Sequence, residues 1–187
     1  MQIIRFADLK ATPWRNGGGV TRDLASHPQG AAAQDWDWRV SIAEVTKAGD
    51  FSPFPGMERV LTVVEGELLL LTVDGADHPL EKYRPFRFDG GAPAAGSLPT
   101  GDIRNLDVIT RSGKFKGYTS IIELSKKRAH PVFAGQLAVL LQGQAAASVA
   151  GGGPVDLGRY DAVVGADESS PEILGRGFLA VVSVDAV

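Results

Sequence analysis

Short apolar runs, each bounded by glycine, proline or aspartate, are the feature that most constrains the fold of this 187-residue chain. Helical periodicity is scarce, and no run approaches the roughly 20 apolar residues that a membrane helix needs. The clearest strand alternates between two faces: Trp36, Trp38, Val40 and Ile42 on one, and Asp37, Arg39, Ser41 and Ala43 on the other. Further strands are expected at residues 3–6, 60–64, 67–73, 104–111, 117–124, 137–141, 145–149, 162–164 and 178–184. Residues 90–101, rich in Pro and Gly, are expected to form a loop. We therefore predict an all-β fold with few short helices.

Part of this strand pattern recurs 77 residues further along the chain. The segment 63–67 (VVEGE) resembles 140–144 (LLQGQ), and the same offset relates Gly75 to Gly152, Leu80 to Leu157 and Tyr83 to Tyr160. A repeat of this length is too long for a solenoid and suits two small β-barrels or jelly rolls sharing a core. We expect an N-terminal half at 1–112 and a C-terminal half at 113–187, packed as one compact unit.

The composition excludes several classes of function. The net charge of −3 provides no basic excess for neutralising phosphates, so direct nucleic-acid binding is disfavoured. The absence of cysteine rules out disulfides, thiolate metal sites and a cysteine nucleophile. The first residues contain no apolar signal-peptide core, so we expect a cytoplasmic protein that does not associate with membranes.

Three consecutive glycines lie in the segment 14–23 (WRNGGGVTRD). Glycine loses more backbone freedom on folding than other residues, so such a run indicates a sharp bend or a close approach to another group. The neighbouring tryptophan, amide and guanidinium groups suit a pocket for a small anion. A tight loop between two strands, with incidental polar neighbours, explains the segment equally well.

Four motifs, of which the glycine segment is the first, give the chain a family resemblance. They are WRNGGGxTR at 14–22, WRVSxA at 38–43, GxFSxFPGxER at 49–59 and FxFxG at 86–90. Together and in this order, they closely resemble the HutD/Ves family, which implies a bicupin of two cupin-type barrels. The chain departs from the family at Asn105 and Asp107, where the family usually has Asp-x-Asn. Both residues still share a strand face, so the same two groups could enter a pocket.

The resemblance also implies a function. The family is linked to bacterial histidine utilisation, in a regulatory role, and is thought to bind a small carboxylate intermediate. Urocanate, formylglutamate and formate are the natural candidates. Because cupins often dimerise, the resemblance keeps homodimerisation through a sheet edge open.

Metal and nucleophilic chemistry find little support in the sequence. The three histidines, His27, His78 and His130, are widely separated and form no His-x-His pair. No Gly-x-Ser-x-Gly elbow is present, and the glycine run lacks the ending of a phosphate-binding loop. We expect no metal and no cofactor.

The arginines are stronger candidates for ligand binding, because a guanidinium group can bind a carboxylate through two parallel hydrogen bonds. Arg39 can face either outward or into a barrel, and each arginine could instead form a structural ion pair with an aspartate. Trp14 could form a flat wall of a pocket or belong to the core. The predicted ligand-binding residues are Asn16, Gly17, Gly18, Arg22, Arg39, Arg59, Asn105 and Asp107.

We therefore expect a metal-independent binding protein for a small carboxylate. One alternative is a metal-independent isomerase or hydrolase, for which Glu58 and Asp107 are the available general acid–base pair. Another is a protein-interaction module in which the pocket is vestigial.

Overall fold

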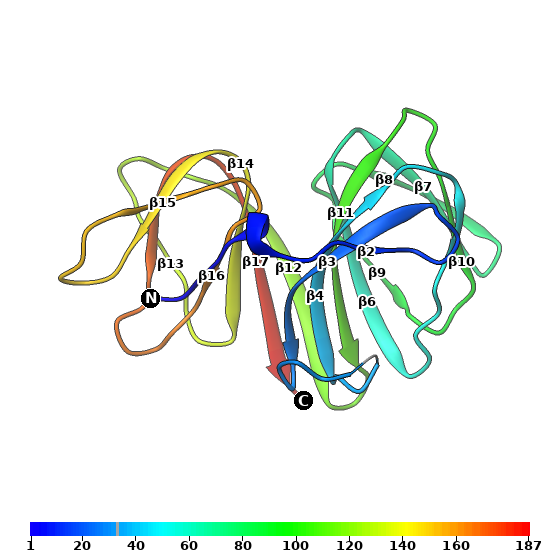
Figure 1. Cartoon of the computed structure of the whole chain (residues 1–187), viewed down its shortest axis with the longest axis horizontal. Coiled ribbons are helices and arrows are strands. Elements are labelled where there is room, and N and C mark those ends of the chain that lie inside the picture. The colour runs from blue at the N-terminus through cyan, green and yellow to red at the C-terminus, as the bar shows by residue number, and fades with distance from the viewer. Residues whose placement is uncertain (33) are drawn as a thin grey trace. The chain divides into compact units, whose positions relative to one another are not determined.

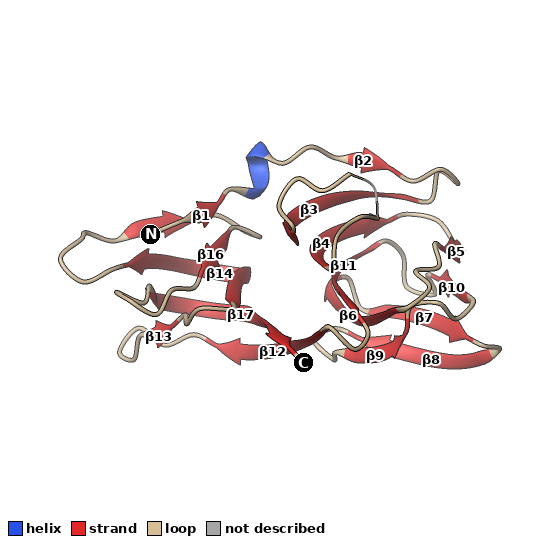
Figure 2. Cartoon of the chain, turned by 90° about the horizontal axis from the view of Figure 1, so that it is seen from below, coloured by secondary structure: helices blue, strands red, loops and turns tan. Residues whose placement is uncertain are grey.

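The computed structural model of the chain describes residues 1–32 and 34–187, and it is built almost entirely of β-strands (Figures 1 and 2). Within this described part, the one helical element is the short 3-10 helix η1 (Phe6–Asp8). No helix among the described residues is long and apolar enough to cross a membrane. The prediction of an all-β chain with few short helices is confirmed.

The chain divides into two compact units, which we call the N-terminal and C-terminal units. The N-terminal unit contains Lys10–Gly117 with Ala186–Val187, and the C-terminal unit contains Met1–Leu9 with Tyr118–Asp185. The first nine residues thus lie in a different unit from the one expected from a boundary at residue 112. They do so because β1 (Ile3–Ile4) pairs with β16 (Ala162–Val164), and Arg5 forms an ion pair with Asp161 at 2.8 Å.

Two antiparallel sheets form the N-terminal unit. Among the described residues, one sheet has the order β2-β3-β4-β11-β6-β9 and the other β5-β10-β7-β8. The strands are β2 (Thr12–Pro13), β3 (Gly19–His27), β4 (Trp38–Val45), β5 (Gly49–Phe51), β6 (Met57–Glu65), β7 (Leu68–Val73), β8 (Ala76–Glu81), β9 (Phe86–Asp89), β10 (Ala94–Ser97) and β11 (Ile103–Arg111). Apolar side chains of both sheets meet in one buried cluster, which includes Val45, Leu61 and Leu71.

Strand β10 corrects the expectation of a loop at 90–101. This strand has the sequence Ala-Ala-Gly-Ser and pairs with both β5 and β7. Its residues are small because the space around them is filled: a Cβ on Gly96 would come within 2.8 Å of Phe51 and 3.0 Å of Leu69. A strand made of small residues carries no hydrophobic alternation, so the pattern of apolar residues could not reveal it.

The C-terminal unit is built around one sheet with the order β1-β16-β14-β17-β12, in which β13 also pairs with β17 and β15 with β14. Its remaining strands are β12 (Phe115–Glu123), β13 (His130–Pro131), β14 (Gln136–Ser148), β15 (Val155–Leu157) and β17 (Glu172–Ala186). The strands expected at 137–141 and 145–149 are one strand, β14, with a bulge near Leu140 and Gln142. Within its buried apolar cluster, Leu140, Val163 and Leu179 are fully buried.

The backbone bears out the internal repeat. Tyr83 and Tyr160, 77 positions apart, both adopt left-handed conformations, with φ of 66° and 67°. The Tyr83 N–H donates to the Val63 carbonyl at 2.8 Å, and the Tyr160 N–H donates to the Leu140 carbonyl at 2.6 Å. The two acceptors are also 77 positions apart. Non-glycine residues seldom adopt this conformation, so its recurrence with the same hydrogen bond indicates a duplicated β unit.

The glycine at position 19 offers a first test of this packing. A Cβ at Gly19 would lie 2.3 Å from the Glu44 carbonyl oxygen and 3.2 Å from the Trp14 ring. We predict that Gly19→Ala lowers the free energy of unfolding of the N-terminal unit by about 1–3 kcal/mol, as expected of overpacking. Trp14, Trp36 and Trp38 are the only tryptophans and all lie in this unit, so urea denaturation followed by tryptophan fluorescence measures it. Gly49→Ala, in the same unit, is the control, because a Cβ there would meet only Asn16 Nδ2, at the ordinary contact distance of 3.4 Å.

His130 makes the stability of the C-terminal unit depend on pH. Burial of this half-buried side chain lowers its pKa from the usual 6.5. The unfolded chain therefore takes up a proton at a higher pH than the folded chain, and stability falls as the pH drops below about 6.5. We predict that His130→Asn reduces the loss of thermal stability between pH 7.5 and pH 5.5, measured by calorimetry. An unchanged loss would contradict this assignment.

Candidate functional site

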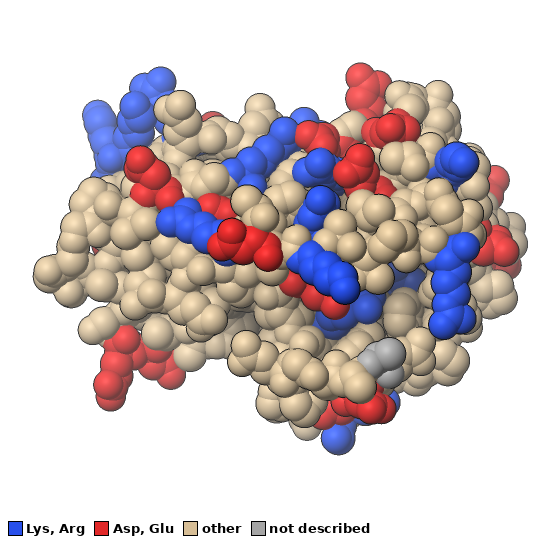
Figure 3. Space-filling model, in the orientation of Figure 1, with Lys and Arg blue, Asp and Glu red and all other residues tan. Residues whose placement is uncertain are grey.

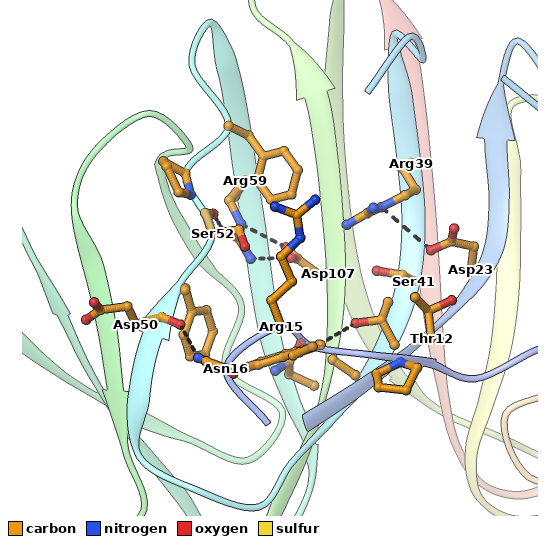
Figure 4. Close-up of a pocket in the computed structure, with 18 of the residues that line it drawn as sticks. Thr12, Arg15, Asn16, Asp23, Arg39, Ser41, Asp50, Ser52, Arg59 and Asp107 are labelled. Atoms are coloured by element: carbon orange, nitrogen blue, oxygen red, sulfur yellow. Dashed lines mark hydrogen bonds and ion pairs between the residues drawn. The ribbon is translucent and has the colours of Figure 1, made fainter. Parts of the chain in front are cut away.

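A cavity of about 730 Å³ lies within the N-terminal unit. Its walls come from the segment 12–16, from β3, β4, β6 and β11, from Gln34 and from the segment 50–54. The lining residues are Thr12, Pro13, Trp14, Arg15, Asn16, Thr21, Asp23, Gln34, Arg39, Ser41, Ala43, Asp50, Phe51, Ser52, Pro53, Phe54, Arg59, Asn105 and Asp107. Figure 4 shows most of these side chains.

Strand register arranges the sheet side of the cavity in rows. Ile109 lies opposite Arg39 on β4 and Arg59 on β6, so the two arginines belong to one row. In the next row, Asp107 lies opposite Ser41. In the third row, Asn105 lies opposite Ala43. Successive side chains on one face of a strand are about 6.6 Å apart, so the arginine row and Asn105 are separated by about 13 Å of sheet.

Arg59 and Asp107 form a buried ion pair at the centre of this surface. Arg59 is 6% exposed and Asp107 is 5% exposed. The Arg59 Nη2 donates to Asp107 Oδ2 at 2.5 Å, and its Nη1 donates to the Ser52 carbonyl oxygen at 3.2 Å. The guanidinium also lies 5.2 Å from the ring centroid of Phe54 and 5.3 Å from that of Phe88. The pair thereby ties β6 to β11 and leaves little freedom to Arg59.

Arg39 points into the cavity, which decides between the two orientations that the sequence left open. Its guanidinium lies 4.9 Å from the Trp36 ring centroid and 5.4 Å from that of Phe54. Its nearest carboxylate is Asp23, at 3.7 Å from Nε, too long for a hydrogen bond. The buried Nε has no hydrogen-bond partner among the described residues. Arg39 therefore retains an unused donor.

Arg15 adds a third guanidinium group. Figure 4 shows its side chain extending from the loop into the space between Arg59 and Arg39. Among the described lining residues, the three arginines are matched by three aspartates, Asp23, Asp50 and Asp107. Asp107 is engaged by Arg59, and the exposed Asp23 forms a long ion pair with Arg39, so the formal charges of these residues balance while the Arg39 Nε keeps a donor without a hydrogen-bond partner among the residues described. Elsewhere on the face shown in Figure 3, basic and acidic side chains are interspersed.

The glycine segment forms a hairpin turn between β2 and β3, as the second interpretation of its sequence expected. The Trp14 N–H donates to the Gly19 carbonyl at 2.9 Å, which closes the turn. The Gly17 N–H donates to the Trp14 carbonyl at 3.1 Å, and the Gly18 N–H donates to Asn16 Oδ1 at 2.8 Å. Both amides are thus used within the turn. Gly17 and Gly18 are not among the described residues that line the cavity, contrary to the prediction that they face a ligand.

Asn16 lines the cavity, but its amide is also engaged locally. Its Nδ2 donates to the Asp50 carbonyl at 3.1 Å, so the side chain joins the glycine turn to β5. Trp14 lines the cavity too, and its indole N–H donates to Thr21 Oγ1 at 2.7 Å. The tryptophan is fixed both by this bond and by an edge-on contact with Phe51 at 5.5 Å between centroids.

Two other predicted residues lie away from the cavity. On β3, the neighbours Thr21 and Asp23 line it, while Arg22 between them belongs to the opposite face. On β6, Glu58 precedes Arg59, faces away from the cavity and pairs with Arg87. The acid–base pair of Glu58 and Asp107 that an enzyme would require is therefore not assembled. In the part of the chain that the structure describes, no three His, Asp or Glu side chains are grouped to hold a metal ion.

Sequence reasoning missed several lining residues. Ser41 carried a usable signal, because it alternates with Arg39 on one strand face. Phe51, Ser52 and Phe54 belong to the motif that ends at Arg59, but nothing in their spacing indicated that they lie around its side chain. Gln34 and Asp50 reach the cavity from segments that carry no distinctive pattern.

The two halves differ in their interiors. In the N-terminal unit, Asp107 lies opposite Leu61 and Asn105 lies opposite Val63. In the repeat, 77 positions later, Leu61 corresponds to Ala138 and Val63 corresponds to Leu140. The residues opposite them are Val181 and Leu179. The C-terminal unit thus has hydrocarbon at both positions where the N-terminal unit has its buried carboxylate and amide.

The buried ion pair leads to a stability prediction. We expect Arg59→Met to lower the free energy of unfolding of the N-terminal unit by about 3–5 kcal/mol, because it leaves the Asp107 carboxylate buried without its partner. The double variant Arg59→Met with Asp107→Leu should recover a large part of that loss, since both charges are removed. Tryptophan fluorescence in urea measures both effects. If the double variant is less stable than Arg59→Met alone, this account is wrong.

Comparisons with known proteins agree with this architecture. Protein Ves from Citrobacter koseri is 35% identical over 125 residues, which cover 64% of this chain and 64% of Ves. The chain's match thus spans just under two thirds of the length of this curated relative. A structure of HutD from Pseudomonas fluorescens SBW25, described as the formate condition, is 27% identical with a TM-score of 0.80, covering 100% of this chain and 98% of HutD.

A more distant structure supports the fold alone. A cupin 2 conserved barrel domain protein from Leptotrichia buccalis is 9% identical with a TM-score of 0.61, covering 100% of this chain and 96% of that protein. The cupin-type fold that the resemblance implied is therefore confirmed. The model of the HutD family matches residues 6–181. With nearly its whole length matched, the chain belongs to the HutD family.

Proposed function

We propose that this protein binds a small carboxylate in the cavity of its N-terminal unit, without a metal, and that binding serves a regulatory role in histidine utilisation. The candidate ligands are urocanate, formylglutamate and formate. Arg39 and Arg15 would hold the carboxylate, and the pair of Arg59 and Asp107 would shape the cavity beside it.

The state of Arg39 is the observation that carries this proposal. A buried N–H without a partner is unfavourable, because it has lost its hydrogen bonds to water and gained none in exchange. The side chain is kept in place by Trp36 and Phe54, so it cannot easily turn toward solvent. A bound carboxylate would satisfy Nε and a neighbouring Nη at once, in the two-bond geometry that guanidinium favours. Arg15, exposed and aimed at the same space, would add a second cation.

Relatives support the pathway and the class of ligand. HutD from Pseudomonas fluorescens has nearly the same fold, and its structure is described as a formate condition. A Pseudomonas putida relative, 33% identical over 117 residues, is described by its position in the hutC 3′ region. Both descriptions belong to those proteins, and we extend them to this chain as part of the proposal.

The direct test is titration calorimetry with urocanate, formylglutamate and formate. We predict that at least one of these acids binds, and that Arg39→Gln weakens its binding about tenfold to a hundredfold, as expected of a lost charge-assisted hydrogen bond. Arg22→Gln is the matched control, because Arg22 is an arginine on the face of β3 opposite the cavity. Its affinity should equal that of the unmodified protein.

Two results would overturn the proposal. One is the absence of binding by every acid at millimolar concentration. The other is an equal loss of affinity in Arg39→Gln and Arg22→Gln, which would indicate a general effect of charge. Tryptophan fluorescence provides a second readout, because Trp14 lines the cavity.

A further inference from the structure

Asn105 is a deeply buried polar side chain that lines the cavity. It is 2% exposed, lies on β11 two positions from Asp107, and faces the cavity from the third row of the sheet. Its Nδ2 has no hydrogen-bond partner among the described residues. Burying an amide without a hydrogen-bond partner is unfavourable by about 1–3 kcal/mol. A bound ligand that accepts a hydrogen bond from Nδ2 would remove this cost.

Two unused donors therefore face one cavity from different places. The Nε of Arg39 lies in the first row, and the Nδ2 of Asn105 lies in the third. The Cα positions of these rows are about 13 Å apart along the sheet, a distance that the long arginine side chain can shorten considerably. A ligand of one or two heavy atoms cannot satisfy both donors. A ligand with an acceptor at each end can.

The electrostatic surroundings of the two donors differ. Arg39 and the exposed Arg15 both line the cavity, so a negative charge is favoured at the arginine end. Asn105 is neutral and lies beside the Asp107 carboxylate, whose charge is already matched by Arg59. A second carboxylate next to Asp107 would have to be desolvated without a cation of its own, which is costly. The Asn105 end therefore favours an acceptor that is polar but uncharged.

We infer that Asn105 is a specificity-determining residue that selects two-ended ligands, with a carboxylate at the Arg39 end and an uncharged hydrogen-bonding group, such as an amide carbonyl, at the Asn105 end. This inference rests on the proposed function and narrows it. Simple monocarboxylates occupy only the arginine end. Symmetric dicarboxylates bind less well than the half-amides of the same length.

Three acids of equal length test the inference. Succinamate, succinate and butyrate share a carboxylate and a four-carbon chain, and they differ only in an amide, a carboxylate or a methyl group at the far end. Calorimetry on the full chain should give succinamate an affinity at least about tenfold higher than butyrate, the effect of one satisfied buried donor. Succinate should fall below succinamate. The five-carbon series of glutaramate, glutarate and valerate repeats the comparison at a longer span.

The variant Asn105→Leu separates recognition from structure. It should remove the advantage of succinamate over butyrate, with acetate, which is too short to reach residue 105, as the reference ligand. It should also raise the thermal unfolding temperature of the ligand-free protein, because it replaces an unsatisfied buried amide with a side chain of similar shape. A purely structural asparagine would give the opposite, a lower unfolding temperature.

Thr62→Val is the matched control for that variant. Thr62 on β6 is also fully buried, and its hydroxyl has no partner among the described residues, but it does not line the cavity. The change should leave the order of the three acids intact.

The outcomes separate this inference from the broader proposal. If no acid binds the unmodified protein, the proposed function fails. If acids bind but succinamate has no advantage over butyrate, or Asn105→Leu weakens all three acids equally, carboxylate binding stands and the role of Asn105 is refuted.

Discussion

The buried pair of Arg59 and Asp107 is the interaction on which the cavity depends. Charges are excluded from protein interiors unless they are paired, and here one pair holds two neighbouring strands together inside a barrel. The rings of Phe54 and Phe88 pack against the Arg59 guanidinium and leave the side chain little room for another conformation. This fixed, neutral centre allows a polar cavity to exist within an otherwise apolar interior. Around it lie Arg39 and Asn105, whose Nε and Nδ2 donors have no hydrogen-bond partner among the described residues.

Much of the fold could be predicted from the sequence, because alternation and repetition are local signals. The alternating strand expected at 36–45 is present as β4 at Trp38–Val45, and the 77-residue offset predicted a backbone repeat that the structure contains. The failures have physical causes. Strand β10 is made of small residues that fit under Phe51, so it lacks an apolar pattern. The placement of residues 1–9 in the C-terminal unit depends on pairing with β16, more than 150 residues away, which no local pattern encodes.

The cavity could be predicted only in part. Of the eight ligand-binding residues predicted from strand alternation and the family motifs, five line the cavity: Asn16, Arg39, Arg59, Asn105 and Asp107. Arg22 was misplaced because the parity of β3 cannot be read from a strand of mixed polarity. The amides of Gly17 and Gly18 were assigned to a ligand, but the turn itself uses them. Whether a hydrogen-bond donor is used within the protein depends on the tertiary structure. The sequence therefore could not distinguish donors that bond to the protein itself from donors that are left for a ligand.

The left-handed tyrosines limit how this chain can change over evolutionary time. At Tyr83 and Tyr160, a β-branched replacement would bring its branch against the backbone, whereas glycine or asparagine would fit with little strain. We expect both positions to draw on a narrow set of amino acids in relatives, for reasons of chain geometry alone. Because glycine or asparagine would meet the same bend with less strain, an aromatic residue retained there would reflect packing of its ring, such as the contact of Tyr160 with Phe6 at 5.2 Å between ring centroids.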